Sequence, residues 1–146
     1  MAQRMNVRGA SGAQDELSPA APLPGHSQAW PERVQLLGAG GAGVSAAALL
    51  LRERGVAITC TDRAESEHTQ MLRERGIAVE IGGNASLRTG VGLVVRSAAV
   101  PDSDPCVAAA RERGVTVLKY SDLLARLCPT HRTLAVAGTH GKTSTT

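Results

Sequence analysis

From residue 33 onward, short apolar runs alternate with segments of small and charged residues. The apolar runs are rich in Val, Leu and Ile and are short enough to be buried strands. The predicted strands cover residues 33–37, 56–62, 77–81, 91–95 and 115–118. Helices are predicted over residues 44–54, 104–113 and 122–127, the last capped by Ser121. Strands that alternate with helices predict an α/β fold, a Rossmann-like parallel sheet with helices on both faces.

Three predicted helices end in the same four residues, Arg-Glu-Arg-Gly, and a predicted strand follows each time. The three copies are residues 52–55, 73–76 and 111–114. Basic residues suit the negative end of a helix, and glycine adopts the left-handed conformation that caps it. The alternative, three basic anion sites, conflicts with the helix dipole, which repels anions at this end. The unequal spacing of the copies argues against a solenoid repeat. We interpret them as structural helix ends.

A glycine-rich loop separates the first predicted strand from the first predicted helix. Residues 38–43 read Gly-Ala-Gly-Gly-Ala-Gly, which matches G-x-G-x-x-G, and Asp62 ends the next strand. Glycines let the backbone approach a diphosphate, and the helix N-terminus supplies partial positive charge. Asp62 would accept hydrogen bonds from a ribose or a base. This order of parts predicts a dinucleotide-binding unit.

A second glycine motif lies at residues 138–144, Gly-Thr-His-Gly-Lys-Thr-Ser, after an apolar run at 133–137 that predicts a buried strand. Strand, glycine turn and Lys-Thr are the parts of a phosphate-binding loop. Lys142 would place a cation on the outer phosphates, and the Thr143 hydroxyl would reach Mg²⁺. The usual G-x-x-x-x-G-K-[ST] pattern has glycine where this chain has Val136, so this loop is shorter. The structural alternative is a glycine turn followed by a solvated lysine.

The composition of the chain changes near residue 31. Residues 1–31 are rich in Ala, Gly, Ser and Pro without apolar periodicity, which predicts a disordered tail. Residues 32–130 hold the five strands of the Rossmann-like domain. Residues 131–146 predict the beginning of an ATP-binding domain. Because a phosphate loop needs the helix behind it, we expect the sequence to be the N-terminal part of a longer enzyme, inactive by itself.

Aromatic residues make up only 1% of the 146 residues, with Trp30, Tyr120 and no Phe. The core must therefore consist of aliphatic side chains, and base stacking would have to rely on something other than an aromatic platform. The net charge is +3, with basic residues interleaved among acids. No basic patch stands out, which argues against a nucleic-acid partner.

The three cysteines, Cys60, Cys106 and Cys128, lie far apart without a C-x-x-C spacing. This pattern favours buried structural thiols over disulfides or metal ligands. No apolar stretch is long enough to cross a bilayer, and the N-terminus lacks the continuous apolar core of a signal peptide. We therefore expect a cytoplasmic protein without membrane insertion.

The shorter phosphate loop, in the sequence Ala-Gly-Thr-His-Gly-Lys-Thr-Ser-Thr-Thr, resembles that of the ATP-dependent Mur ligases of peptidoglycan synthesis. Residues 38–45 are similar to the family's G-x-G-G-x-G-M-S, with Val44 in place of Met. Residues 60–62 look like its G-S-D. Residues 96–101 look like its S-S-A-[IV]-P, with one serine replaced by alanine. Both glycine motifs stand in the family's order, and the resemblance covers residues 33–146.

The resemblance implies an ATP-dependent ligase that joins L-alanine to the lactyl carboxyl of UDP-N-acetylmuramate through an acyl phosphate. The first domain would hold the UDP part, and the second would hold ATP and Mg²⁺. Lys142 would be catalytic by countering charge on the transferred phosphoryl group, and Thr143 would hold the metal. The implied UDP-sugar contacts are Gly38, Gly40, Gly41, Ala42, Gly43, Asp62 and Ser97. The implied ATP contacts are Gly138, Thr139, His140, Gly141, Lys142, Thr143 and Ser144.

Three other functions remain open at this point. A related recycling ligase that attaches a preformed peptide to the same sugar nucleotide would carry the same loops. Residues 33–130 could instead bind a nicotinamide dinucleotide, which Asp62 suits but the phosphate loop does not. A non-catalytic UDP-sugar-binding module is the third alternative. The sequence downstream of Thr146 would discriminate best among them.

Overall fold

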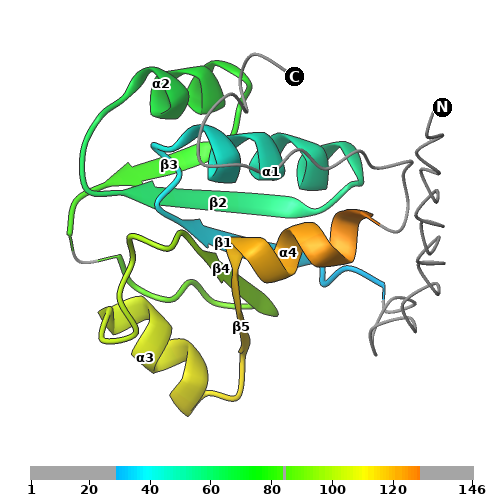
Figure 1. The fold of residues 1–146 in the computed structure, drawn as a ribbon, viewed down its shortest axis with the longest axis vertical. Coiled ribbons are helices and arrows are strands. Elements are labelled where there is room, and N and C mark those ends of the chain that lie inside the picture. The colour runs from blue at the N-terminus through cyan, green and yellow to red at the C-terminus, as the bar shows by residue number, and fades with distance from the viewer. Residues whose placement is uncertain (1–28, 84, 129–146) are drawn as a thin grey trace, which may run out of the picture.

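The computed structural model describes residues 29–83 and 85–128, which form a parallel sheet with helices on both faces (Figure 1). The strands follow one another in the sheet as β3-β2-β1-β4-β5, and every pair is parallel. The strands are β1 (Arg33–Leu37), β2 (Ala57–Asp62), β3 (Ala78–Ile81), β4 (Leu93–Arg96) and β5 (Thr116–Lys119). The helices are α1 (Ala42–Glu53), α2 (Glu67–Glu74), α3 (Pro105–Glu112) and α4 (Tyr120–Leu127). The predicted α/β fold is confirmed.

Two aliphatic clusters separate the layers. On one face α1, α2 and α4 pack on the sheet through side chains such as Leu51, Leu72 and Leu123, each fully buried. On the other face α3 covers β4 and β1 through Val107 and its neighbours. Trp30 and Tyr120 only border the first cluster, so the core is aliphatic, as the composition predicts.

The connection from β3 to β4 forms no helix among its described residues. The segment from Ala85 to Val91 instead lies against the sheet beside β1. The buried side chain of Gln35 holds it there: its amide donates to the Ser86 carbonyl, and its oxygen accepts from the Arg88 N–H, both at 3.0 Å. A buried amide is tolerated because both of its ends are paired.

The Arg-Glu-Arg-Gly segments end α1, α2 and α3 as predicted. Gly55, Gly76 and Gly114 have φ values of +81°, +71° and +69°, the left-handed conformation of a helix cap. A strand begins two residues after each glycine. The prediction of structural helix ends is confirmed.

Two helix starts differ from the sequence prediction. The first helix begins at Ala42 rather than Val44, so Gly43 lies in its first turn. Ser121 is not the cap of the last helix, which begins at Tyr120 after Lys119. The reason is Asp122, whose carboxylate accepts the Lys119 N–H at 3.2 Å and so caps the helix from within its first turn.

Helix α2 lies over the outer strand β3 and closes on itself with a capping box. Ser66 Oγ accepts the Thr69 N–H at 3.2 Å, and Thr69 Oγ1 accepts the Ser66 N–H at 2.8 Å. From its last turn, Arg73 donates to the Val79 carbonyl of β3 at 3.2 and 3.4 Å. The arginine therefore binds the helix to the edge of the sheet.

None of the helices in the described ranges has the length and apolar character that crossing a bilayer requires. Cys60 and Cys106 are buried, as predicted, whereas Cys128 is only partly so. Most of the predicted tail, at residues 1–28, and the predicted phosphate loop at 138–144 lie outside the described residues.

Candidate functional site

The strand order reverses between β1 and β4, and the glycine loop leaves β1 at that point. Gly38 turns the chain with a φ of +81°. Its N–H and that of Ala39 donate to the Thr61 carbonyl of β2 at 2.9 and 3.1 Å. A side chain at Gly38 would meet the Ser97 Cβ at 2.6 Å. The loop thus packs between the carboxyl ends of β2 and β4. Ligands of open α/β sheets bind at this end of the strands.

Asp62 holds the second glycine of the loop. Its Oδ2 accepts the Gly40 N–H at 2.7 Å, and its Oδ1 accepts the Ala64 N–H at 3.2 Å. A Cβ at Gly40 would lie 2.8 Å from Oδ2 and 2.9 Å from the carboxyl carbon. The sequence suggests a glycine here so that a ligand can approach the backbone. The structure gives a different reason, because the space is filled by the chain's own aspartate.

The third glycine of the pattern accommodates a ring. A Cβ at Gly43 would lie 2.9 Å from two carbons of the Tyr120 ring, so the first turn of α1 packs on the start of α4. Gly41, by contrast, faces open space, with only the Gly38 carbonyl oxygen at 3.9 Å. Gly41 is therefore the glycine of the loop with room for a ligand beside it.

The N-terminus of α1 offers positive partial charge. Gly41 is its N-cap, no side chain caps it, and its first turn carries no acidic residue. The first N–H groups of a helix lack intrahelical partners, and the helix dipole favours an anion beside them. This turn and the loop before it can therefore hold a phosphate group.

Ser97 lies at the end of β4, beside the glycine loop. Its N–H donates to the Leu37 carbonyl at 2.9 Å, and its hydroxyl accepts the Ala99 N–H at 3.3 Å. The hydroxyl thus shapes the turn that follows β4. The ligand contact that the sequence predicts for the Ser97 side chain stays a prediction.

The buried side chain of Arg96 holds the turn that follows β4. The side chain of Arg96 is 7% exposed and pairs with Asp102 at 3.0 Å, and its guanidinium also donates to the Val100 carbonyl. Arg111 of α3 pairs with the same carboxylate. The hydrogen bond from Arg111, helped by the charge of Arg96, lowers the pKa of Asp102 below its ordinary value.

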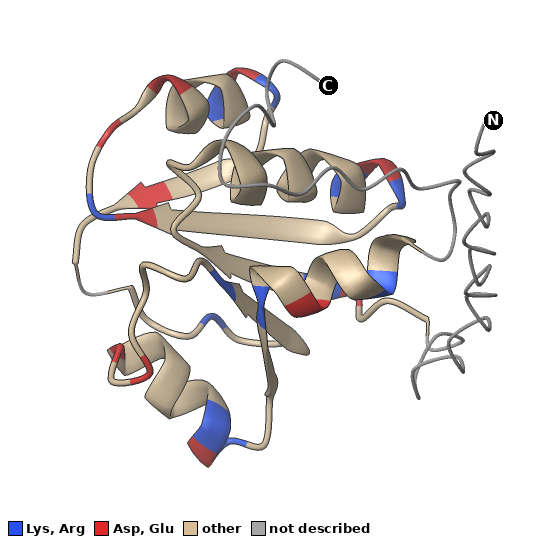
Figure 2. Ribbon diagram, viewed as in Figure 1, with Lys and Arg blue, Asp and Glu red and all other residues tan. Residues whose placement is uncertain are grey.

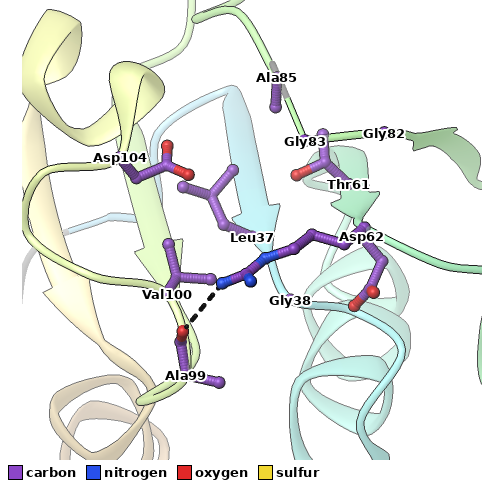
Figure 3. Close-up of a pocket in the computed structure, with 11 residues that line it drawn as sticks. Leu37, Gly38, Thr61, Asp62, Gly82, Gly83, Ala85, Ala99, Val100 and Asp104 are labelled. Atoms are coloured by element: carbon purple, nitrogen blue, oxygen red, sulfur yellow. Dashed lines mark hydrogen bonds between the residues drawn. The ribbon is translucent and has the colours of Figure 1, made fainter.

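A cleft of about 360 Å³ opens at the carboxyl ends of β1 and β2 (Figure 3). Leu37, Ala85 and Val100 form its apolar part, and Asp62 and Asp104 lie on opposite sides of it. Arg63, the residue after β2, also lines it and donates from Nη2 to the Ala99 carbonyl at 3.4 Å. The cleft therefore combines an apolar floor with charged walls, as small-molecule sites do.

The structure brings together all seven predicted UDP-sugar contacts at one edge of the sheet. Gly38 and Asp62 border the cleft itself. The predicted ATP contacts, Lys142 and Thr143 among them, lie outside the described residues. Sequence analysis missed Arg63, Val100 and Tyr120 as parts of the site. The position of Arg63 directly after Asp62, the acid that ends β2, could have predicted that it lies at the site.

In the rest of the described part of the chain, charged residues are distributed rather than gathered (Figure 2). Figure 2 shows Lys and Arg near the ends of the helices, interspersed with Asp and Glu. Among the described residues, no group of three or more His, Cys, Asp or Glu side chains is placed to hold a metal ion.

Comparison with known proteins identifies the family. The profile described as "Mur ligase family, catalytic domain" matches residues 33–132. The chain belongs to the Mur ligase family. The UDP-N-acetylmuramate–L-alanine ligase of Symbiobacterium thermophilum is 47% identical over 114 residues, 77% of this chain and 23% of that protein. The ligase of the same name from Kineococcus radiotolerans is 49% identical over 117 residues, 77% of this chain and 25% of that protein.

Two solved Mur ligase structures share the fold. A murein peptide ligase from Psychrobacter arcticus has a TM-score of 0.70 at 28% identity and covers 78% of this chain and 24% of its own. The UDP-N-acetylmuramate–alanine ligase of Thermotoga maritima has a TM-score of 0.60 at 28% identity and covers 63% of this chain and 21% of its own. The chain spans about a quarter of the length of these Mur ligases.

Proposed function

We propose that this Mur ligase domain binds the UDP part of UDP-N-acetylmuramate, and that the whole protein joins L-alanine to that sugar nucleotide. The observation that carries the proposal is the glycine loop at the reversal of strand order, fixed by Asp62 and followed by the uncapped N-terminus of α1. This arrangement supports binding of a diphosphate. The names of the relatives, at 47% and 49% identity, support the choice of sugar nucleotide.

Within the site, the residues divide into two roles. Gly41 and the first turn of α1 present backbone N–H groups to the diphosphate. Asp62 holds the loop in place through Gly40, and Ser97 shapes the turn after β4 that lies beside the loop. Because the loop is preformed, it does not have to be ordered when the diphosphate binds, which lowers the entropic cost of binding.

For the whole protein, ATP would supply the phosphoryl group that activates the lactyl carboxylate. Residues 138–144 would hold it, with Lys142 beside the outer phosphates and Thr143 at Mg²⁺. This assignment rests on the sequence and the family. Lys142→Ala in the intact enzyme should therefore lower kcat by orders of magnitude and leave UDP-sugar affinity nearly unchanged. Activity within a few-fold of wild type would contradict the assignment.

A second candidate is the ligase that attaches a preformed peptide to the same sugar nucleotide. The observation that favours it is the TM-score of 0.70 with the murein peptide ligase. Both candidates use the same first domain, so the choice of amine is decided by assay of the whole enzyme with L-alanine and with the peptide. The higher kcat/KM identifies the substrate.

The sugar-nucleotide proposal is tested by thermal unfolding of the 146-residue chain. A ligand that binds only the folded state adds about 2.7 kcal/mol at about one hundred times its Kd. We expect UDP-N-acetylmuramate to raise the melting temperature and NAD at the same concentration to raise it much less. A larger shift with NAD would favour the nicotinamide alternative and overturn the proposal.

A further inference from the structure

The cleft beside the glycine loop continues the proposed diphosphate site toward β2. Gly38 borders both, and Asp62 holds the loop with one oxygen while lining the cleft. A nucleotide whose diphosphate lies at the start of α1 can therefore place its nucleoside in this cleft. At about 360 Å³ the cleft lies near the lower end of the range of small-molecule sites, roughly 300–1,000 Å³.

The walls of the cleft suit a flat ring. The side chains of Leu37, Ala85 and Val100 are 2%, 9% and 8% exposed and form an apolar surface. Gly82 and Gly83 contribute no side chains to the opposite part of the lining. A planar nucleobase gains from burial against such a surface on one face, and needs a partner on the other.

None of the described residues that line this cleft is aromatic. The chain has only two aromatic residues. Tyr120 stands against Gly43, and Trp30 borders the cluster on the α1 side of the sheet. The partner for the second face of a base must therefore come from another planar group. Among the described residues of the lining, Arg63 supplies a planar group that is also cationic, its guanidinium.

The position of Arg63 fits this role. Its backbone follows the end of β2, and its Nη2 reaches the Ala99 carbonyl after β4 at 3.4 Å. The side chain thus spans the cleft between its two walls, although the residue is exposed on its outer side. A guanidinium plane is weakly hydrated and stacks on flat π systems, and it does so on the bases of nucleic acids.

We propose that the Arg63 guanidinium stacks on the uracil base of the bound nucleotide, in place of an aromatic side chain. The inference rests on the proposed function, since it concerns the base of the same ligand. The hydrogen bond to Ala99 orients the guanidinium across the cleft. Arg63 is then a residue that determines selectivity for a planar base.

The competing role for Arg63 is an ion pair with the diphosphate. The two roles differ in what they require of the base. Stacking requires a flat π system, whereas an ion pair requires only the phosphates. UDP and its 5,6-dihydrouridine counterpart have the same charge and nearly the same hydrogen-bonding edge, but the dihydro base is puckered and lacks the ring double bond. Calorimetric titration of the 146-residue chain with both ligands separates the two roles.

For the wild-type chain we expect UDP to bind about tenfold more tightly than dihydro-UDP, the size of a cation–π contact of about 1.4 kcal/mol. Arg63→Lys keeps the charge and loses the plane, whereas Arg63→Gln removes the charge and leaves a shorter, neutral amide. In both variants the preference for UDP should fall to within about twofold of unity. Arg113→Lys is the matched control. Arg113 follows the C-terminus of α3, which lies near the amino ends of the strands, whereas the cleft lies at their carboxyl ends. This variant should keep the tenfold preference.

Each result decides the proposal. If Arg63→Gln weakens both ligands equally and the preference remains, Arg63 pairs with the phosphates and the stacking proposal is wrong. If neither ligand is affected, Arg63 has no role in binding and the proposal is also wrong. A wild-type chain that binds neither ligand overturns the proposed function itself, and this inference with it. Melting temperatures of the variants confirm that they are folded.

Discussion

The Gly40 N–H donates to the Asp62 carboxylate at 2.7 Å, and this contact joins the end of β2 to the loop that follows β1. Asp62 therefore stabilises the conformation of the loop through a contact within the chain itself. The acid at the end of the second strand is usually considered for its contact with a ribose. In this chain it also determines the conformation of the glycine loop.

Removing the carboxylate should reduce both stability and binding. Asp62→Ala leaves the Gly40 and Ala64 N–H groups without this acceptor, so we expect the free energy of unfolding to fall by about 1–2 kcal/mol. UDP affinity should fall at least several-fold because the loop is no longer held in place. Asp62→Asn keeps one acceptor oxygen for Gly40 and should lie between Ala and wild type. Denaturant titration and calorimetry check both effects, and an unchanged Asp62→Ala chain would contradict this role.

The loop glycines should differ sharply in their tolerance of a methyl group. A Cβ at Gly40 would lie 2.8 Å from Asp62, so Gly40→Ala should cost about 1–3 kcal/mol of stability, as overpacking does. Gly41→Ala is the matched control, because its Cβ would meet only a carbonyl oxygen at 3.9 Å. Its expected cost is about 0.5–1 kcal/mol, because alanine is a poorer N-cap than glycine.

The double variant tests the reason for that difference. In an Asp62→Ala background the carboxylate is gone, so adding Gly40→Ala should be nearly neutral for the free energy of unfolding. If Gly40→Ala remained as costly there as in the wild type, the cause would be the backbone conformation of the loop rather than its contact with Asp62.

The ion pairs of Asp102 should make stability depend on pH in acid. Arg111 and Arg96 lower the pKa of Asp102 from its ordinary value of 3.8, so the folded state favours the ionised carboxylate. The stabilisation is present above the unfolded pKa and is lost as the pH falls through the lower, folded pKa. Asp102→Asn should therefore be less stable than wild type near neutral pH, and the gap should shrink below about pH 4.

Melting temperatures between pH 7 and pH 2 check that expectation. Glu112→Gln, which removes an exposed carboxylate at the end of α3, is the control and should leave the pH dependence of wild type nearly unchanged. A gap between wild type and Asp102→Asn that stayed constant down to pH 2 would show that the ion pairs with Arg96 and Arg111 do not stabilise the fold.

The cysteines should differ in their reaction with thiol reagents. Burial raises the pKa of the Cys60 thiol to about 12 and that of Cys106 to about 11, so both stay protonated at pH 8. Because the thiolate is the reactive form, Cys128 should be alkylated first, since it is only partly buried. Cys60 and Cys106 should react only as fast as the domain opens. Peptide mass spectrometry after iodoacetamide treatment, with and without denaturant, measures the three rates.

The sequence predicts best those features whose cause is local. The Arg-Glu-Arg-Gly segments predict three helix ends because a left-handed cap depends on the glycine and the turn before it. The spacing of the glycine loop and Asp62 predicts one edge of the sheet because strand, loop and helix follow one another directly. The alternation of strands and helices predicts the layers for the same reason.

Features that depend on distant contacts escape the sequence. Gln35 lies in an apolar run, and its partners in the Ser86–Arg88 segment are set by the path of a connection that no pattern describes. Asp102 pairs with Arg96 of β4 and also with Arg111, and it joins the two arginines only because the fold packs α3 beside β4. The cleft at Arg63 likewise needs four separate segments brought together. The predicted start of α4 was wrong by two residues, Asp122 instead of Tyr120, because Asp122 caps the helix from inside.

The contact of Arg73 with the Val79 carbonyl has a consequence for how molecules of this chain meet. Strand β3 is an edge strand of the sheet. The outer side of an edge strand presents backbone N–H and C=O groups that can pair with a strand of another molecule. The Val79 carbonyl already accepts hydrogen bonds from the guanidinium of Arg73 in α2. The positive charge of that guanidinium lies where a strand of a second chain would have to pair. The helix end that closes α2 therefore also opposes aggregation through the sheet edge.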